Sequence, residues 1–217
     1  MGRRTKKNPE VTLGRRQRRR KEQRRKNVRE VISTILYLAI LCAAVYFILH
    51  YVGQRTVVRG DSMDTTLSGG QNLIMDKLSY HFRNPERYDI VIFPGPEEYG
   101  EHPYYIKRVI GLPGETVEIR DGHIYIDGSE KPLEEDYLKE TWIWENDGYT
   151  FEVPEGCYFV LGDNRNDSED GRLWANEAIK KGLASTPEEA EQYSFVRKDE
   201  IKGKAIFKYY SRFAILK

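Results

Sequence analysis

The chain of 217 residues has a formal net charge of +1, but this near-neutral total combines two unlike parts. Residues 1–29 carry a net charge of +12 and the remaining residues carry −11, which indicates different compartments or partners for the two parts. The two cysteines, Cys42 and Cys157, are not expected to form a disulfide. The four histidines are scattered without the spacing of a zinc site, so no zinc ion is expected.

Residues 1–29 form a basic tail with fourteen Lys and Arg and only two Glu. Such a composition cannot bury enough apolar surface to fold alone, so we predict a disordered cytoplasmic segment that contacts anionic membrane lipid. RNA is an alternative partner, but aromatic residues, which stack on exposed bases, are not interleaved with the basic ones. We therefore expect no nucleic acid partner.

Residues 30–52 are predicted to form a transmembrane anchor, because Val31 to Leu49 is a run of 19 residues without a charge. At about 1.5 Å per residue this run spans roughly 28 Å, close to the hydrocarbon thickness of a bilayer. A cleaved signal peptide is the alternative, but the basic segment before the run is too long for one. The excess of basic residues before the run predicts a single-pass protein of the cell membrane, with a cytoplasmic N-terminus and residues 53–217 outside.

Residues 53–217 are predicted to form one mostly antiparallel β domain, because the apolar segments are short, β-rich and separated by Gly and Pro. Asp121-Gly122 between two alternating segments is a strong signal for a two-residue hairpin turn. Residues 173–193 are predicted to be a small helical insertion, since residues 186–189 read Thr-Pro-Glu-Glu, the pattern of a helix N-terminus.

Ser62 and Lys107 are candidates for a nucleophile and its base. Ser62 lies in a Gly-Asp-Ser-Met turn soon after the predicted anchor, where its hydroxyl would lie beside free backbone N–H groups. Lys107 lies in an apolar segment, and strand alternation places it on one face with Tyr105 and Val109. Burial there would lower its pKa from about 10.4 toward 8, which leaves roughly a tenth of the amine neutral at pH 7 and able to take the serine proton. Each residue alone also has a structural interpretation, as a capping serine or an edge lysine.

The acidic segment from Gly162 to Arg172 is the third candidate feature. Calcium binding is one interpretation, but Arg165 occupies a ligand position of an EF-hand loop and Ser168 replaces its required glycine. The alternative is a loop stabilised by its own side chains, with an Asx turn at Asp163 and Asp170 paired with an arginine.

Four segments in this order resemble the sequence boxes of the type I signal peptidases, which are serine-lysine membrane proteases. They are residues 62–67, 87–93, 107–115 and 162–172. The resemblance implies an antiparallel β catalytic domain of signal-peptidase type after one membrane helix, in the compact form typical of Gram-positive bacteria. It also implies a serine endopeptidase that removes signal peptides from exported pre-proteins after small residues, of the Ala-X-Ala type, without a metal or cofactor.

In this resemblance Ser62 is the nucleophile, Lys107 is the general base, and the backbone N–H of Ser62 contributes to the oxyanion hole. Ser168 would hold the lysine amine by a hydrogen bond. The supporting residues implied are Ser168, Asp163, Asn164, Asp170 and Arg172. The residues implied to line the substrate pockets are Val58, Met63, Leu67, Tyr105 and Ile106. The implied partners are signal peptides, membrane lipid and the secretion translocon.

Four positions depart from the family pattern. Gly60 has no hydroxyl to add to the oxyanion hole, Thr65 stands where proline is usual, Gly171 replaces a common serine, and Glu115 replaces an aspartate. None removes Ser62 or Lys107, so activity is expected, with effects on rate or substrate range.

Three other interpretations compete with this one. A catalytically weak or inactive relative could act as a membrane assembly subunit, and loss of the serine or lysine would mark that case. A self-cleaving repressor-type serine-lysine domain would carry a DNA-binding head in place of the membrane helix. A purely structural anchor would leave the serine and lysine segments unexplained.

Overall fold

The structure is a computed structural model, and it forms two compact units, Met1–His50 and Tyr51–Lys217. The residues that the structure describes are 9–48, 52–64, 66–95, 104–138, 140–143, 148–209 and 213–215. Each unit is considered by itself below.

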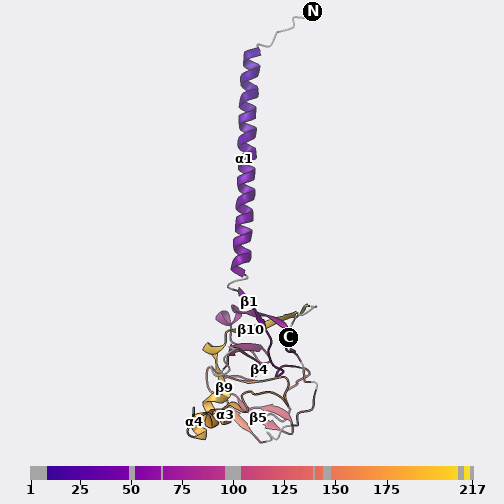
Figure 1. Cartoon of the computed structure of the whole chain (residues 1–217), viewed down its shortest axis with the longest axis vertical. Coiled ribbons are helices and arrows are strands. Elements are labelled where there is room, and N and C mark those ends of the chain that lie inside the picture. Colours follow the sequence, from indigo (N-terminus) through magenta and orange to yellow (C-terminus); the bar gives the residue numbers. More distant parts are fainter. Residues whose placement is uncertain are drawn as a thin grey trace, which may run out of the picture. The chain divides into compact units, whose positions relative to one another are not determined.

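The first unit contains one long helix, α1 (Pro9–Phe47), which Figure 1 shows as an uninterrupted ribbon. By length and composition, its part from Arg18 to Phe47 could cross a membrane. The structure differs from the predicted disordered tail, because residues 9–29 continue this helix. Arg, Lys, Gln and Glu are strong helix formers, and extending an existing helix costs much less than nucleating one.

The second unit is built on a large antiparallel sheet. Among the described residues its strands follow the order β1-β2-β10-β3-β4-β8-β9, with β11 paired to β10. All pairings are antiparallel, which confirms the predicted mostly β fold. The strands are β1 (Gly53–Val57), β2 (Asn72–Asp76), β3 (Ile90–Pro94), β4 (Tyr104–Gly111), β8 (Cys157–Leu161), β9 (Phe195–Arg197), β10 (Gly203–Tyr209) and β11 (Phe213–Ile215).

A second, three-stranded sheet has the order β6-β5-β7. Its strands are β5 (Thr116–Arg120), β6 (His123–Ile126) and β7 (Thr150–Glu152). The turn between β5 and β6 has φ of 49° at Asp121 and 69° at Gly122. Positive φ at both central residues is what a type I′ turn requires, so the predicted hairpin is confirmed.

Strands β3 and β4 lie between two apolar clusters, and this position buries the central part of β4. Ile90 and Ile92 pack into a cluster with residues of β2, β10 and the turn that follows β1, whereas Val91 and Phe93 pack on the opposite face. The pairing of β3 with β4 then fixes the face on which each β4 side chain lies, with Val91 opposite Lys107.

The short helices are α2 (Ser79–Phe82), α3 (Trp174–Lys180) and α4 (Pro187–Glu191). Helices α3 and α4 pack on each other and make up the predicted helical insertion (Figure 1). The Thr186 hydroxyl accepts a hydrogen bond of 3.2 Å from the backbone N–H of Glu189, which confirms the predicted N-cap. Because α3 starts directly after the acidic 162–172 loop, the insertion is tied to the region of the candidate site.

Candidate active site

Lys107 is a buried amine in the middle of β4, with 3% of its surface exposed. Its Nζ donates a hydrogen bond of 3.0 Å to Ser168 Oγ and lies 5.7 Å from the centre of the Tyr105 ring. Burial lowers the pKa of Lys107 to about 8, and the nearby Asp170 carboxylate only partly opposes this effect. An amine with this pKa can act as a base near neutral pH.

Ser62 lies in a tight turn that the acidic loop holds in place. The turn is closed by a hydrogen bond of 2.9 Å from the backbone N–H of Asp64 to the carbonyl of Asp61. Asn164 donates to this turn twice, from its backbone N–H to the carbonyl of Ser62 and from its side chain to the carbonyl of Asp61, both at 3.0 Å. Thr65 lies outside the described residues.

Ser62 and Lys107 line the same open cleft of about 580 Å³. The cleft residues are Arg55, Thr56, Val57, Val58, Arg59, Gly60, Asp61, Ser62, Met63, Tyr104, Tyr105, Ile106, Lys107, Asp167 and Glu169. Four of the five predicted substrate-pocket residues are therefore present in it. The fifth, Leu67, is fully buried in the cluster behind the cleft, together with Met63, and the structure does not place it on the cleft surface.

Ser168, Asp170 and Arg172 form a chain of polar contacts that ends at Lys107. Ser168 Oγ donates to Asp170 Oδ2 at 2.7 Å, while the Arg172 guanidinium contacts both oxygens of Asp170 at 2.7 and 2.8 Å. Asp170 is fully buried, which by itself would raise its pKa, but the Arg172 charge and hydrogen bonds hold the pKa below the usual range. The carboxylate is thus committed to Arg172 and Ser168, and the lysine contacts a hydroxyl.

Gly162 joins the serine turn to the lysine contact, and sequence reasoning gave it no role. A Cβ at this residue would lie 2.2 Å from Ser168 Oγ and 2.4 Å from the carbonyl oxygen of Ser62. Only glycine allows this approach. The signal in the sequence was the position of a glycine directly before Asp163, at the end of β8.

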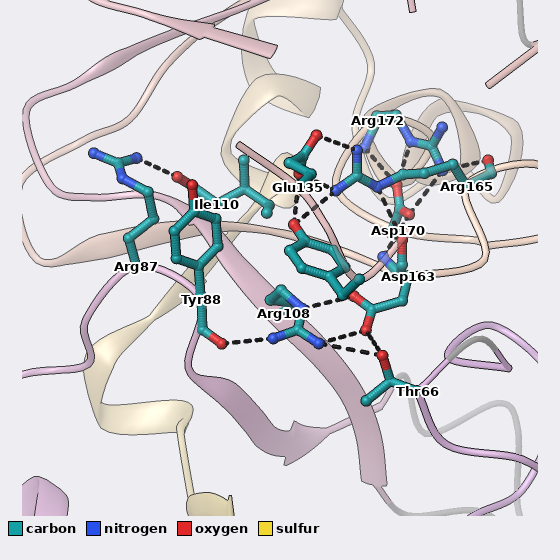
Figure 2. Close-up of polar contacts among 12 residues, drawn as sticks. Thr66, Arg87, Tyr88, Arg108, Ile110, Glu135, Asp163, Arg165, Asp170 and Arg172 are labelled. Atoms are coloured by element: carbon teal, nitrogen blue, oxygen red, sulfur yellow. Dashed lines mark hydrogen bonds and ion pairs between the residues drawn. The ribbon is translucent and has the colours of Figure 1, made fainter. Parts of the chain in front are cut away.

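On the opposite face of β4, Arg108 and Asp163 form a buried ion pair (Figure 2). Arg108 donates to the two carboxylate oxygens at 2.8 and 2.6 Å and to the carbonyl of Tyr88 at 3.0 Å. The Thr66 hydroxyl donates to the same carboxylate, and the Asp163 backbone N–H points to Met63 Sδ at 3.4 Å. Asp163 therefore connects the serine turn to the middle of β4, and Arg108 is a partner that sequence reasoning missed.

Two of the positions that depart from the family pattern, Gly60 and Gly171, are glycines for structural reasons. Gly60 has φ of 76° in open space, so its backbone conformation favours glycine. A Cβ at Gly171 would lie 2.6 Å from the carbonyl oxygen of Ser194 and 2.8 Å from the Phe159 ring, so a side chain does not fit there. The missing serine at this position therefore reflects close packing.

The helical insertion reaches the cleft through Trp174. Its ring stacks on Tyr105, a cleft residue, with 5.9 Å between centroids and an interplanar angle of 11°. It also meets Phe93 edge-on at 5.9 Å. Trp174 thus supports the wall that lies beside Lys107.

Comparisons with known proteins place the chain in a family. The family model described as "Signal peptidase, peptidase S26" matches residues 29–210, which include both candidate catalytic residues and the whole acidic loop. The chain belongs to this signal peptidase family. It is therefore a peptidase of the S26 type, and its N-terminal apolar helix is compatible with membrane anchoring.

Relatives within the signal peptidase family match most of the chain. The probable signal peptidase I-1 of Synechocystis sp. is 38% identical over 152 residues, which cover 68% of this chain and 74% of that protein. Signal peptidase I of Bacillus licheniformis is 36% identical over 183 residues, or 81% of this chain and 90% of that protein. A crystal structure of a signal peptidase I from Enterococcus faecalis V583 is 34% identical and covers 56% of this chain and 97% of its own, with a TM-score of 0.40.

Proposed function

We propose that this chain removes N-terminal signal peptides from exported pre-proteins, with Ser62 as nucleophile and Lys107 as general base. The observation that carries the proposal is the buried Lys107 amine, whose pKa is lowered to about 8 in the same cleft as Ser62. Names of relatives at 36–38% identity, all signal peptidase I, support the substrate class.

The chemistry uses a base that takes up and releases a proton twice. The neutral amine of Lys107 takes the hydroxyl proton as Ser62 Oγ attacks the carbonyl carbon before the cut. The resulting ammonium then gives this proton to the leaving amine of the mature chain, which leaves the signal peptide as an ester on Ser62. A water molecule then gives a proton to the same amine and attacks the ester carbonyl. The ammonium returns this proton to Ser62 Oγ as the signal peptide leaves as a free carboxyl group. The backbone N–H of Ser62 would stabilise the oxyanion, without a hydroxyl from Gly60.

The supporting residues keep the amine in place and neutral. Ser168 accepts a hydrogen bond from Lys107 and donates its own proton to Asp170, so the amine does not contact a carboxylate directly. Direct contact with a carboxylate would favour the ammonium form and remove the base. Arg172 completes the arrangement because it occupies both Asp170 oxygens.

The cleft walls favour small side chains beside the cut. Val58, Met63, Tyr105 and Ile106 give an apolar surface close to Ser62, and the buried Leu67 supports it from behind. Such a shallow apolar surface excludes large residues by clash, in line with cleavage after Ala-X-Ala. The substrate would lie as an extended strand along the cleft edge.

We also propose the domain arrangement that the charges predict. Residues 1–29 are the cytoplasmic segment, residues 30–52 are the anchor and residues 53–217 are the extracytoplasmic catalytic domain. The support is the +12 charge before the apolar run, since basic residues are retained on the cytoplasmic side. Anionic lipid and the translocon are the partners expected near this anchor.

The test is cleavage of a pre-protein with an Ala-X-Ala site in detergent or lipid, by the wild type, Ser62→Ala and Lys107→Ala. We expect cleavage by the wild type and a loss of about a thousandfold or more in both folded variants. A folded wild type that does not cleave would instead support an inactive membrane assembly subunit. Normal cleavage by either variant would disprove the proposed pair.

A further inference from the structure

A segment outside the four signal-peptidase boxes contacts the loop that holds Lys107. We call residues 133–138 and 140–143 the strap; it lies between β6 and β7 in the sequence. The strap is fixed at several points by hydrogen bonds. The backbone N–H of Leu133 donates to the carbonyl of Ile124 at 2.8 Å, and Asn166 bonds the carbonyl of Thr141 and the N–H of Ile143 at 3.1 and 3.0 Å.

Glu135 of the strap forms a buried ion pair with Arg165 of the acidic loop (Figure 2). The Arg165 guanidinium donates to both carboxylate oxygens, at 2.5 and 3.1 Å, and these side chains are only 2% and 8% exposed. The Tyr137 hydroxyl donates to the same carboxylate at 2.5 Å and accepts a bond of 3.2 Å from Arg165. The Tyr137 ring also lies 3.9 Å from the Arg108 guanidinium.

Arg165 is connected to the lysine contact through the loop backbone. Its Nε donates to the carbonyl of Gly162 at 3.1 Å, and the N–H of Gly162 donates to Asp170 at 3.0 Å. The backbone carbonyl of Arg165 accepts a hydrogen bond of 3.0 Å from the Arg172 guanidinium. Asp170 in turn holds Ser168, which contacts Lys107. A continuous set of bonds therefore leads from the strap to the amine.

We propose that Glu135, assisted by Tyr137, is a positioning residue that sets the geometry of the Ser168–Lys107 contact through Arg165. The inference rests on the proposed function and adds a residue to its machinery. A bidentate carboxylate–guanidinium pair fixes orientation in a plane, which a point contact does not.

The charge of Glu135 also determines which carboxylate the Arg165 guanidinium binds. Asp170 is another carboxylate whose charge acts on Arg165. Without the Glu135 charge, Arg165 would be attracted to Asp170 and compete with Ser168 and Arg172 for its oxygens. A buried ion pair adds little net stability because desolvation offsets its attraction, so orientation is the contribution to test.

The experiment compares Glu135→Gln with Glu134→Gln in the full-length protein in detergent or lipid. Glu134 is exposed and one residue away, so it is a matched control for the same chemical change. With active sites counted by a serine-acylating probe, we expect kcat of Glu135→Gln to fall about ten- to hundredfold with KM within about twofold. The acid limb of its pH profile should move to lower pH, since withdrawal of Asp170 removes a charge that favours the ammonium form. Glu134→Gln should match the wild type.

Tyr137→Phe provides a second, milder test, because it keeps the ring on Arg108 and removes only the hydroxyl that bonds Glu135 and Arg165. We expect about a threefold loss of kcat and a smaller shift of the same sign. If both variants keep the wild-type kcat per active site and the acid limb of neither pH profile moves, the inference is overturned. The ion pair is then purely structural. If Glu135→Gln does not fold, Tyr137→Phe decides. Failure of the proposed function is distinguishable, because Ser62→Ala or Lys107→Ala would then cleave or the wild type would not.

Discussion

Two neighbouring buried basic residues on opposite faces of β4 have different kinds of partner. Lys107 and Arg108 are 3% and 2% exposed, yet Arg108 is paired with the Asp163 carboxylate and Lys107 contacts a hydroxyl. A guanidinium stays charged in proteins and needs a carboxylate when buried, whereas an ammonium can lose its proton. Burial alone therefore does not create a base; the type of partner decides between a scaffold and a reactive group.

Lys107→Arg gives the largest effect, because it places the same kind of cation on both faces. The variant keeps the charge but cannot supply a neutral base, so we expect a loss of about a thousandfold or more in kcat/KM. Steady-state cleavage of a pre-protein measures it, with circular dichroism to show that the fold is retained. An arginine variant within tenfold of the wild type would show that deprotonation of residue 107 is not required.

Asp163→Asn breaks the scaffold face. The Arg108 charge would remain buried without its counter-ion, and we expect unfolding free energy to fall by about 3–5 kcal/mol. Urea titration of the variant measures this, with the exposed Asp136→Asn as a control that should change stability by less than about 0.5 kcal/mol. Equal stability of the two variants would mean that Arg108 does not depend on Asp163.

The pH dependence of the wild type sharpens the comparison from the reactive face. With neutral Lys107 as the proposed base, kcat/KM should rise with pH and level off above about pH 8, the pKa of Lys107. About a tenth of the plateau activity is then expected at pH 7. The folded state binds fewer protons than the unfolded chain between about pH 8 and 10.5, so this group also makes stability rise with pH in that window. A limb below pH 6 would contradict the assignment.

Trp174→Leu gives the smallest expected effect. Loss of the stacked ring would loosen Tyr105 and admit water to Lys107, which raises the pKa of the amine toward its usual value. We expect the acid limb to move up by about half a unit and activity at pH 7 to fall about threefold. Trp174→Phe keeps an aromatic contact and should move less. If Trp174→Leu and Trp174→Phe give identical pH profiles, the ring of residue 174 does not influence the pKa of Lys107.

Local patterns predicted much of this arrangement. Alternation placed Tyr105 and Val109 on one face of β4, and both pack in the same cluster. The Asp121-Gly122 hairpin and the Thr186 cap are also confirmed, because each depends on a few consecutive residues. The roles of Ser62 and Lys107 in catalysis remain a prediction.

The features that were missed depend on contacts between distant residues. Glu135 and Arg165 are 30 residues apart, and Arg108 and Asp163 are 55 residues apart. No local period links such pairs, so Glu135 and Arg108 read as ordinary surface or strand charges. The helical basic segment was missed for the opposite reason: composition predicted disorder, while helix propensity and an adjoining helix favour order.

The close approach at Gly162 has a consequence for sequence variation. A single methyl group there would collide with Ser62 in the serine turn and with Ser168, which contacts Lys107. These two residues lie about a hundred positions apart in the chain. In a saturation library selected for protein secretion, this position should return glycine alone, although the residue is neither polar nor ionisable. The lack of a side chain at Gly162 is therefore as strict a requirement of the site as its polar side chains are.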